Sequence, residues 1–180
     1  MLTEDSSYKR DRERYGWTRR HLMYCIGLFG TCGNSNWRKP FIEKYQSENI
    51  PFFNPQVKDW APENAVIEAE HLNTDSIILF PVTRESYGFG SLAEIGFAIL
   101  NIVQSRTAGK HHRYVIVFVD PILDDALQTN NPTTAKESTR ARILVREHMK
   151  KLEMHNVFCV DSLQEMLDLS VKIHTDLANT

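Results

Sequence analysis

The feature that most constrains this chain is a regular alternation of strand-length apolar runs with helix-length amphipathic segments. Five runs have the length and apolar character of strands: 21–29 (HLMYCIGLF), 50–54, 75–80, 113–119 and 156–160. Each is followed by a segment with helical spacing of its apolar residues: 37–49, 62–73, the stretch from Ser91 onward, 133–154 and 162–177. A strand followed by a helix, five times over, predicts a parallel sheet covered by helices on both faces.

The order of the strands follows from the same pattern. Right-handed crossovers leave few topologies for such a chain. We expect a three-layer α/β fold, flavodoxin-like or Rossmann-like, with a five-stranded parallel sheet in the order 2-1-3-4-5. Ligands bind such sheets at the carboxyl ends of the strands, where the strand order reverses. The loops at 29–37 and 81–91 flank that switch point and are the expected site.

The ends and the length of the chain suggest its domain organisation. Residues 1–20 are dense in charge and lack apolar periodicity, which predicts a flexible N-terminal arm. An arm that clasps a second subunit or binds phosphate is the functional alternative. The rest, 21–180, suits a single α/β domain. With no membrane-length apolar run and no signal core, we expect a cytoplasmic protein without a membrane partner.

Charge and composition exclude some partners. The formal net charge of −2 argues against binding a DNA or RNA polymer, which needs a surplus of Lys and Arg. The three cysteines, Cys25, Cys32 and Cys159, form no disulfide pattern and fit a reducing compartment. No pair among the seven histidines has a helical metal spacing, so we expect no metal site and no cofactor.

The loop after the first apolar run has the composition of an anion-binding turn. Six of its residues are candidate ligand contacts: Gly30, Thr31, Cys32, Gly33, Asn34 and Ser35. Backbone N–H groups and the N-terminal end of the next helix favour an anion, and Arg38 can pair with a phosphate in bidentate fashion. The spacing matches neither a Walker loop nor the dinucleotide fingerprint. The alternative is a tight strand-to-helix turn that requires glycine.

The second loop leads into SLAEIGFA, in which Glu94 lies near the start of a helix. Ser91 is the expected N-cap, and Gly90 beside it allows a ligand to approach closely. The apolar positions Leu92, Ile95, Ile99 and Val103 repeat at helical spacing. Because its neighbours are small or apolar, Glu94 is expected to face the cleft, where a carboxylate can attack an anomeric carbon. The alternative is a surface residue that complements the helix dipole.

Other side chains lie in or beside these loops. Asn54 and Gln56 can bind a sugar hydroxyl or a base edge, or can make the turn around Pro55. Four aromatic residues can stack on a base or pack in the core: Trp37, Trp60, Tyr87 and Phe89. Three charged residues of the long helix are expected on a solvated face: Glu137, Arg140 and Arg142.

The segments GLFGTCGNSNWRKPFI, FFNPQVKDWAPENAVIEAEHLNTDSIILFPVT and GSLAEIGFAI resemble the nucleoside 2-deoxyribosyltransferase-like proteins. The resemblance runs from about residue 24 to 105, with a weaker similarity in KESTRARILVREHM, and GTCGNSNWR is typical of a subgroup. It implies cleavage of the N-glycosidic bond of a deoxynucleoside or deoxynucleotide. Glu94 then acts as the nucleophile at C1′, and residues 30–38 hold sugar or phosphate. A homodimer or larger homo-oligomer is also implied.

The sequence departs from the family's transferases beside the site. Gly88 stands where they carry an aspartate six residues before the nucleophile. Their acid on the preceding helix has approximate counterparts in Glu68 and Glu70, and Asp59 is a substitute as general acid. Asp75 matches the acidic residue that opens the family's third strand, where it is expected to cap a loop.

These observations leave three functions open. The leading hypothesis is a deoxyribosyltransferase or a nucleoside-monophosphate N-glycosidase, with a nucleoside or nucleotide as its small-molecule partner. The second is a nucleotide-binding or sensing module that does not cleave its ligand. The third is an enzyme similar to the NAD glycohydrolases of the wider fold group, which also use a glutamate against a ribosyl carbon.

Overall fold

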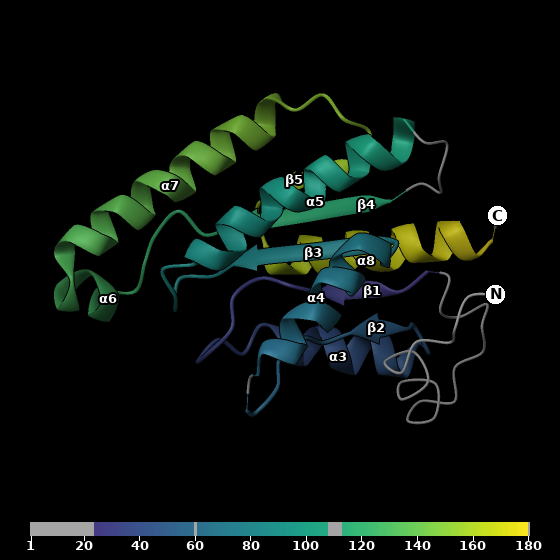
Figure 1. The fold of residues 1–180 in the computed structure, drawn as a ribbon, viewed down its shortest axis with the longest axis horizontal. Helices are drawn as coiled ribbons and strands as arrows, with labels where there is room; N and C mark the ends of the chain where they lie inside the picture. The colour runs from purple at the N-terminus through teal and green to yellow at the C-terminus, as the bar shows by residue number, and fades with distance from the viewer. Residues whose placement is uncertain (1–23, 60, 108–112, 180) are drawn as a thin grey trace.

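The computed structural model describes residues 24–59, 61–107 and 113–179, and it forms a three-layer α/β fold (Figure 1). Its five parallel strands have the order β2-β1-β3-β4-β5, which confirms the predicted order 2-1-3-4-5. The predicted arm at 1–20 and Trp60 lie outside the described residues.

The strands and helices follow the predicted alternation closely. The strands are β1 Ile26–Leu28, β2 Phe52–Phe53, β3 Ile77–Val82, β4 Tyr114–Val119 and β5 Val157–Val160. The helices are α3 Arg38–Ser47, α4 Pro62–Thr74, α5 Phe89–Thr107, α6 Asp125–Asn130, α7 Pro132–Lys151 and α8 Leu163–Ala178. In the parallel register, Ile26 of β1 lies opposite Phe52 of β2 and Ile77 of β3.

The sheet separates two apolar cores because successive strand residues point to opposite faces. Ile77 and Leu79 of β3 pack in the core beneath α3 and α8. Ile78 and Phe80 pack in the other core, beneath α5 and α7. Figure 1 shows α5 and α7 on one side of the sheet and α8 on the other. Both faces of the sheet are therefore covered, as its continuous apolar strands require.

Several helix ends follow from local chemistry. Pro62 is the first residue of α4, where its missing N–H costs nothing. Ser162 caps α8 by accepting a hydrogen bond from the Glu165 N–H at 3.0 Å. Asn131 caps α7 by accepting from the Thr134 N–H at 3.1 Å.

Three local predictions were wrong. Helix α5 begins at Phe89, so Ser91 is a buried residue inside the helix and not its N-cap. The Leu92 N–H donates to the Gly88 carbonyl, which starts the helix earlier. Among the described side chains of α5, the buried apolar ones are Ile95, Ala98 and Ile102, and Val103 of the predicted apolar repeat is exposed.

The third error concerns the segment between β4 and α7, where the sequence analysis gave no helix. Helix α6 forms there because the Asp124 carbonyl accepts from the N–H groups of Leu127 and Gln128. Gln128 also donates from its side chain to the Leu123 carbonyl at 2.7 Å. Among the described residues, no helix is long and apolar enough to cross a membrane.

Candidate active site

The loop between β1 and α3 lies against the end of β3, as expected for a switch point. Gly30 and Gly33 have φ angles of 96° and 81°, in the region that glycine favours. The Thr31 N–H donates to the Pro81 carbonyl at 2.8 Å, and the Thr31 hydroxyl accepts from the Thr83 N–H at 2.9 Å. These two bonds fasten the first loop to the start of the second.

Arg38 holds the first loop from inside. The guanidinium donates to the carbonyls of Leu28 (3.2 Å), Thr31 (2.6 Å) and Gly30 (3.4 Å). It also lies over the Trp37 ring, 4.5 Å from its centroid, and the residue is only 3% exposed. Most of its donors are therefore used within the protein, whereas the sequence led us to expect a phosphate partner. The loop carbonyls that point inward need such a donor, because a buried carbonyl without a hydrogen bond lowers the stability of the folded protein.

Trp37 also serves the loop and the core. Its ring N–H donates to the Thr31 carbonyl at 2.9 Å. The ring packs edge-to-face on Phe41, with centroids 5.2 Å apart. Trp37 is buried, so its position corresponds to the packing alternative for this side chain and not to a base-stacking surface. By contrast, Cys32 and Asn34 are exposed at the tip of the loop.

A hydroxyl and carboxylate cluster joins the two loops. Ser35 and Thr83 share a hydrogen bond between their hydroxyl oxygens at 2.9 Å, and both residues are buried. Burial works to raise the pKa of Glu85, but hydrogen bonds from Thr83, the Glu85 backbone and Ser35 outweigh it and lower that pKa. Sequence reasoning missed Glu85, although a carboxylate just after a strand at the switch point was the available signal.

Glu94 lies in the second turn of α5 and is half-buried. Burial raises the pKa of its carboxyl group, and the negative charge of Glu68 raises it further. A carboxyl group shifted by desolvation and by a specific neighbouring charge is typical of functional sites. The side chain is thus partly withdrawn from bulk solvent, as the catalytic hypothesis requires.

Glu68, on α4, is close enough to influence both halves of the site. Burial lowers the pKa of Arg38, and the thiol of Cys32 and then the charge of Glu68 act in the opposite direction. The same Glu68 charge raises the pKa of Glu94. Helix α4 packs against α5, which brings this second acid toward the candidate nucleophile. Asp59, the other candidate acid, is exposed in the loop before α4.

A shallow hollow of about 340 Å³ opens beside the first loop. Gly33, Ser35, Arg38 and Gln56 of the predicted residues line it, together with Lys39 near the start of α3, whereas Glu94 does not. Lys39 was not predicted, although a cation in the first turn of a helix beside a glycine loop was a usable signal. Asn54 accepts a hydrogen bond from the Gln56 N–H at 3.1 Å, which is the turn-making arrangement.

The second loop is held by a residue expected on the surface. Arg142 of α7 is fully buried, so its placement on a solvated face was wrong. Its guanidinium donates to the carbonyls of Val82 (3.1 Å), Thr83 (3.0 Å), Asp120 (2.8 Å) and Ser86. The cause is the sharp loop after β3, in which the carbonyls of Thr83 and Ser86 turn inward toward α7.

Two stacked aromatic residues lie at the start of α5. Tyr87 and Phe89 stack with ring centroids 6.0 Å apart, and the Tyr87 hydroxyl donates to the Leu127 carbonyl at 3.0 Å. Phe89 is half exposed, and Gly90 beside it is exposed. Gly88 has a φ of 70°, and an added Cβ would lie 2.5 Å from a methyl group of Val82. An aspartate does not fit at this position without movement of the backbone.

The fold and the site together define a Rossmann-like parallel α/β protein with carboxylates at its switch point. No family model matches the chain, and no curated protein does. It is similar to a solved structure described as a conserved protein from Enterococcus faecalis V583, at 12% identity and a TM-score of 0.46. That match covers 84% of this chain and 99% of the other.

Proposed function

We propose that this chain is an N-glycosidic-bond enzyme, a nucleoside deoxyribosyltransferase or a nucleoside-monophosphate N-glycosidase, with Glu94 as its nucleophile. The observation that carries the proposal is the half-buried Glu94 on α5, whose pKa is raised by burial and by Glu68. A carboxylate partly withdrawn from water, near the start of the helix that follows β3 at the carboxyl ends of the strands, suits attack on a sugar carbon. The resemblance in SLAEIGFA gives Glu94 the same role.

The proposed reaction has two steps. The ionised Glu94 oxygen forms a bond to C1′ while the bond from C1′ to the base nitrogen breaks. The departing base takes a proton from water, and Glu68 acts on the site through its negative charge, which raises the pKa of Glu94. In the second step the bond from C1′ to the Glu94 oxygen breaks and the Glu94 carboxylate is released. Water attacks C1′ and gives its proton to the hydroxide left by the first step, which yields the free sugar, or a second base attacks C1′ and loses its proton to that hydroxide, which yields a new nucleoside. The acceptor alone separates hydrolase from transferase.

The substrate would be held by the first loop and its neighbours. Ser35, Thr83 and Glu85 offer two hydroxyls and an ionised carboxylate, a set that suits sugar hydroxyl groups. Lys39 and the N-terminal end of α3 favour an anion on the other side of the loop. A 5′-phosphate would therefore bind toward Lys39 and away from Glu85.

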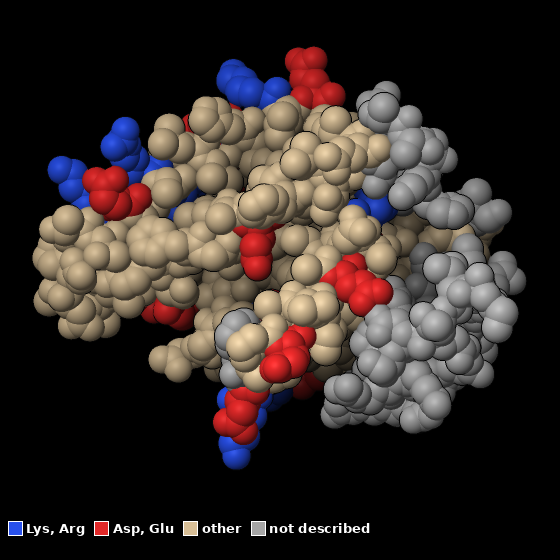
Figure 2. All heavy atoms as spheres, in the orientation of Figure 1, with Lys and Arg blue, Asp and Glu red and all other residues tan. Residues whose placement is uncertain are grey.

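A second copy of this chain is the partner that we propose for α5. The helix exposes large apolar side chains, among them Phe97 (62%) and Leu100 (50%), next to the small residues Ala93 and Gly96. Figure 2 shows that charged side chains are sparse over α5 on this face. An uncharged helix face that continues toward Glu94 suits a two-fold contact. Light scattering should give a dimer mass, and Phe97→Asp should give a monomer.

The non-catalytic sensor has one observation in its favour. Because Gly88 leaves no room for a side chain, the aspartate of the family's transferases has no equivalent here. A nucleotide held without cleavage would agree with that loss.

The deciding experiment is a panel of nucleosides and nucleotides assayed for release of free base. Glu94→Gln should reduce kcat by roughly 10³-fold or more, as removal of a nucleophile does. Glu63→Gln, an exposed acid on α4, is the matched control and should keep full activity. A sugar adduct on Glu94, trapped and found by mass spectrometry, would support the enzyme. Near wild-type turnover by Glu94→Gln would reject the proposed nucleophile, and tight binding without any base release would support the sensor.

A further inference from the structure

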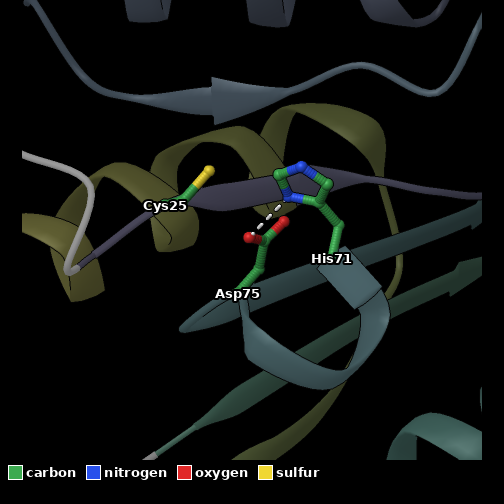
Figure 3. Close-up of side chains that lie close together, drawn as sticks. All are labelled: Cys25, His71 and Asp75. Carbon is green, nitrogen blue, oxygen red and sulfur yellow. Dashed lines mark hydrogen bonds and ion pairs between the residues drawn. The ribbon is translucent and has the colours of Figure 1, made fainter. Parts of the chain in front are cut away.

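A second cluster of chemically active side chains lies at the amino ends of the strands, opposite the carboxyl ends that form the candidate active site. Cys25 directly precedes β1, His71 lies in the last turn of α4, and Asp75 lies between α4 and β3 (Figure 3). One donor atom from each, namely sulfur, nitrogen and oxygen, lies within 4.8 Å of the other two. The residues are only 3%, 3% and 1% exposed. These amino ends of the strands are remote from the edge where α5 begins.

The cluster is held rigidly by its surroundings. The Nδ1 atom of His71 and the Oδ1 atom of Asp75 form a hydrogen bond at 3.0 Å. The imidazole stacks on the Phe53 ring, with centroids 3.6 Å apart and planes within 2°. A Cβ on Gly27 would lie 2.8 Å from Asp75 Oδ2, so the carboxylate packs directly against the β1 backbone. These contacts keep the three side chains close together and leave them only small rotations.

One oxygen of the cluster stands out. Asp75 Oδ2 is buried and accepts no hydrogen bond within the part of the chain that the structure describes. A buried carboxylate oxygen normally has a donor or a metal ion to offset its desolvation. The nearby guanidinium of Arg113 donates instead to backbone carbonyls, that of Asp75 at 2.9 Å and that of Leu72 at 2.6 Å.

We propose that Cys25, His71 and Asp75 bind a single Zn²⁺ ion. A thiolate and a carboxylate together neutralise the dication, so that the buried site carries no net charge with a neutral imidazole. Mixed sulfur, nitrogen and oxygen donors suit zinc, with water as the fourth ligand. Donors on one tetrahedral zinc lie about 3.3–3.8 Å apart at ordinary bond lengths, so small side-chain rotations bring the cluster to that spacing.

The proposed ion would be structural, because the site is closed to substrate. It would tie the C-terminal turn of α4 to β1 and to the start of β3. Helix α4 also carries Glu68, so the ion would fix the helix that brings this acid toward Glu94. The inference stands independently of the proposed reaction, since zinc binding is measured without any substrate.

Metal binding by the full chain is the test. The protein is stripped with a chelator, supplied with Zn²⁺, desalted and analysed by mass spectrometry of its metal content. We expect one zinc per chain and a higher Tm for the zinc-loaded protein. Supplied with Co²⁺, the chain should show a thiolate-to-cobalt charge-transfer band in the near ultraviolet.

Matched variants assign the ligands. Cys25→Ser should lose the charge-transfer band, whereas Cys159→Ser, which changes a half-buried cysteine on β5, should keep it. Asp75→Asn keeps the size of the side chain and should lower zinc affinity at least 10-fold. If Cys25→Ser fails to fold, the double variant Cys32→Ser and Cys159→Ser keeps Cys25 as the only thiol and should retain the band. Folded wild-type protein that binds no zinc, or a double variant without the band, would overturn the proposal.

Discussion

Arg38 and Arg142 each hold one of the two loops at the switch point, but they reach their loops from very different distances along the chain. Arg38 belongs to the helix that directly follows its loop, and it donates to three carbonyls within that loop and the end of β1. Arg142 comes from α7, and it donates to carbonyls of β3, of the β3–α5 loop and of Asp120.

The difference shows how each loop depends on the rest of the fold. The first loop carries its own support, because the arginine and the carbonyls are neighbours in sequence. The second loop positions the start of α5, and hence Glu94, only when α7 has packed on the sheet. Arg142 therefore couples the candidate nucleophile to a distant helix, while Arg38 acts locally.

Replacing Arg142 should have the largest effect on stability. Arg142→Met removes the donor for four buried carbonyls and should lower the free energy of unfolding by about 3–4 kcal/mol. Arg140→Met is the control, since Arg140 is exposed on the same helix and should change stability by less than about 0.5 kcal/mol. Urea unfolding measures both. Equal effects from the two variants would mean that the buried guanidinium contributes little.

Replacing Arg38 should cost less, because Arg38 donates to three carbonyls where Arg142 donates to four, and its bond to the Gly30 carbonyl is long, at 3.4 Å. Arg38→Met should lower the free energy of unfolding by about 2–3 kcal/mol. The exposed neighbour Lys39, replaced by Met, is the control. The same unfolding experiment applies, with hydrogen exchange of the Thr31 amide as a local measure. A larger loss from Arg38 than from Arg142 would reverse the ranking of local and distant support.

The sequence allowed the prediction of features that depend on neighbouring residues. The five strands, their order and the start of α4 at Pro62 follow from short-range periodicity and from the chirality of crossovers. Helix α6 was not predicted, because a helix of six residues is too short to show a repeat of apolar residues. The burial of Arg142 was not predicted, because its hydrogen-bond partners lie in strands and loops far along the chain. In the sequence it looks the same as an arginine on a solvated helix face.

At the candidate site, too, the residues that could be predicted are those whose signal lies in a short stretch of sequence. Glu94 and the glycine loop belong to short segments with their own signal. Lys39 and Glu85 matter because of what the fold places beside them, namely the hollow and the hydroxyls of Ser35 and Thr83. Cys25, His71 and Asp75 come from separate parts of the chain that only the fold brings together, so no spacing in the sequence predicted their cluster.

Thr83 joins the two loops, and its replacement should have a moderate effect. Thr83→Val keeps the shape of the side chain but removes the hydroxyl shared with Ser35, at a cost of about 1 kcal/mol. The pKa of Glu85 is lowered in the folded state, so Glu85 contributes stability above its unfolded pKa and loses it as pH falls through the folded pKa. Thr83→Val should weaken that acid-side loss. Melting curves across acidic pH test it, and an unchanged pH dependence would disconnect Thr83 from Glu85.

Replacing Glu68 of α4 should have the smallest effect. It tests whether the charge of Glu68 influences the ionisation of Glu94. Glu68→Gln removes a negative charge that raises the pKa of Glu94, so that pKa should fall. Since Glu94 must be ionised to attack C1′, the acid limb of the kcat/KM profile should move to lower pH. Glu63→Gln, on the exposed first turn of the same helix, should leave the limb in place. An acid limb that Glu68→Gln does not move would mean that burial alone sets the ionisation of Glu94, and that the two halves of the site act separately.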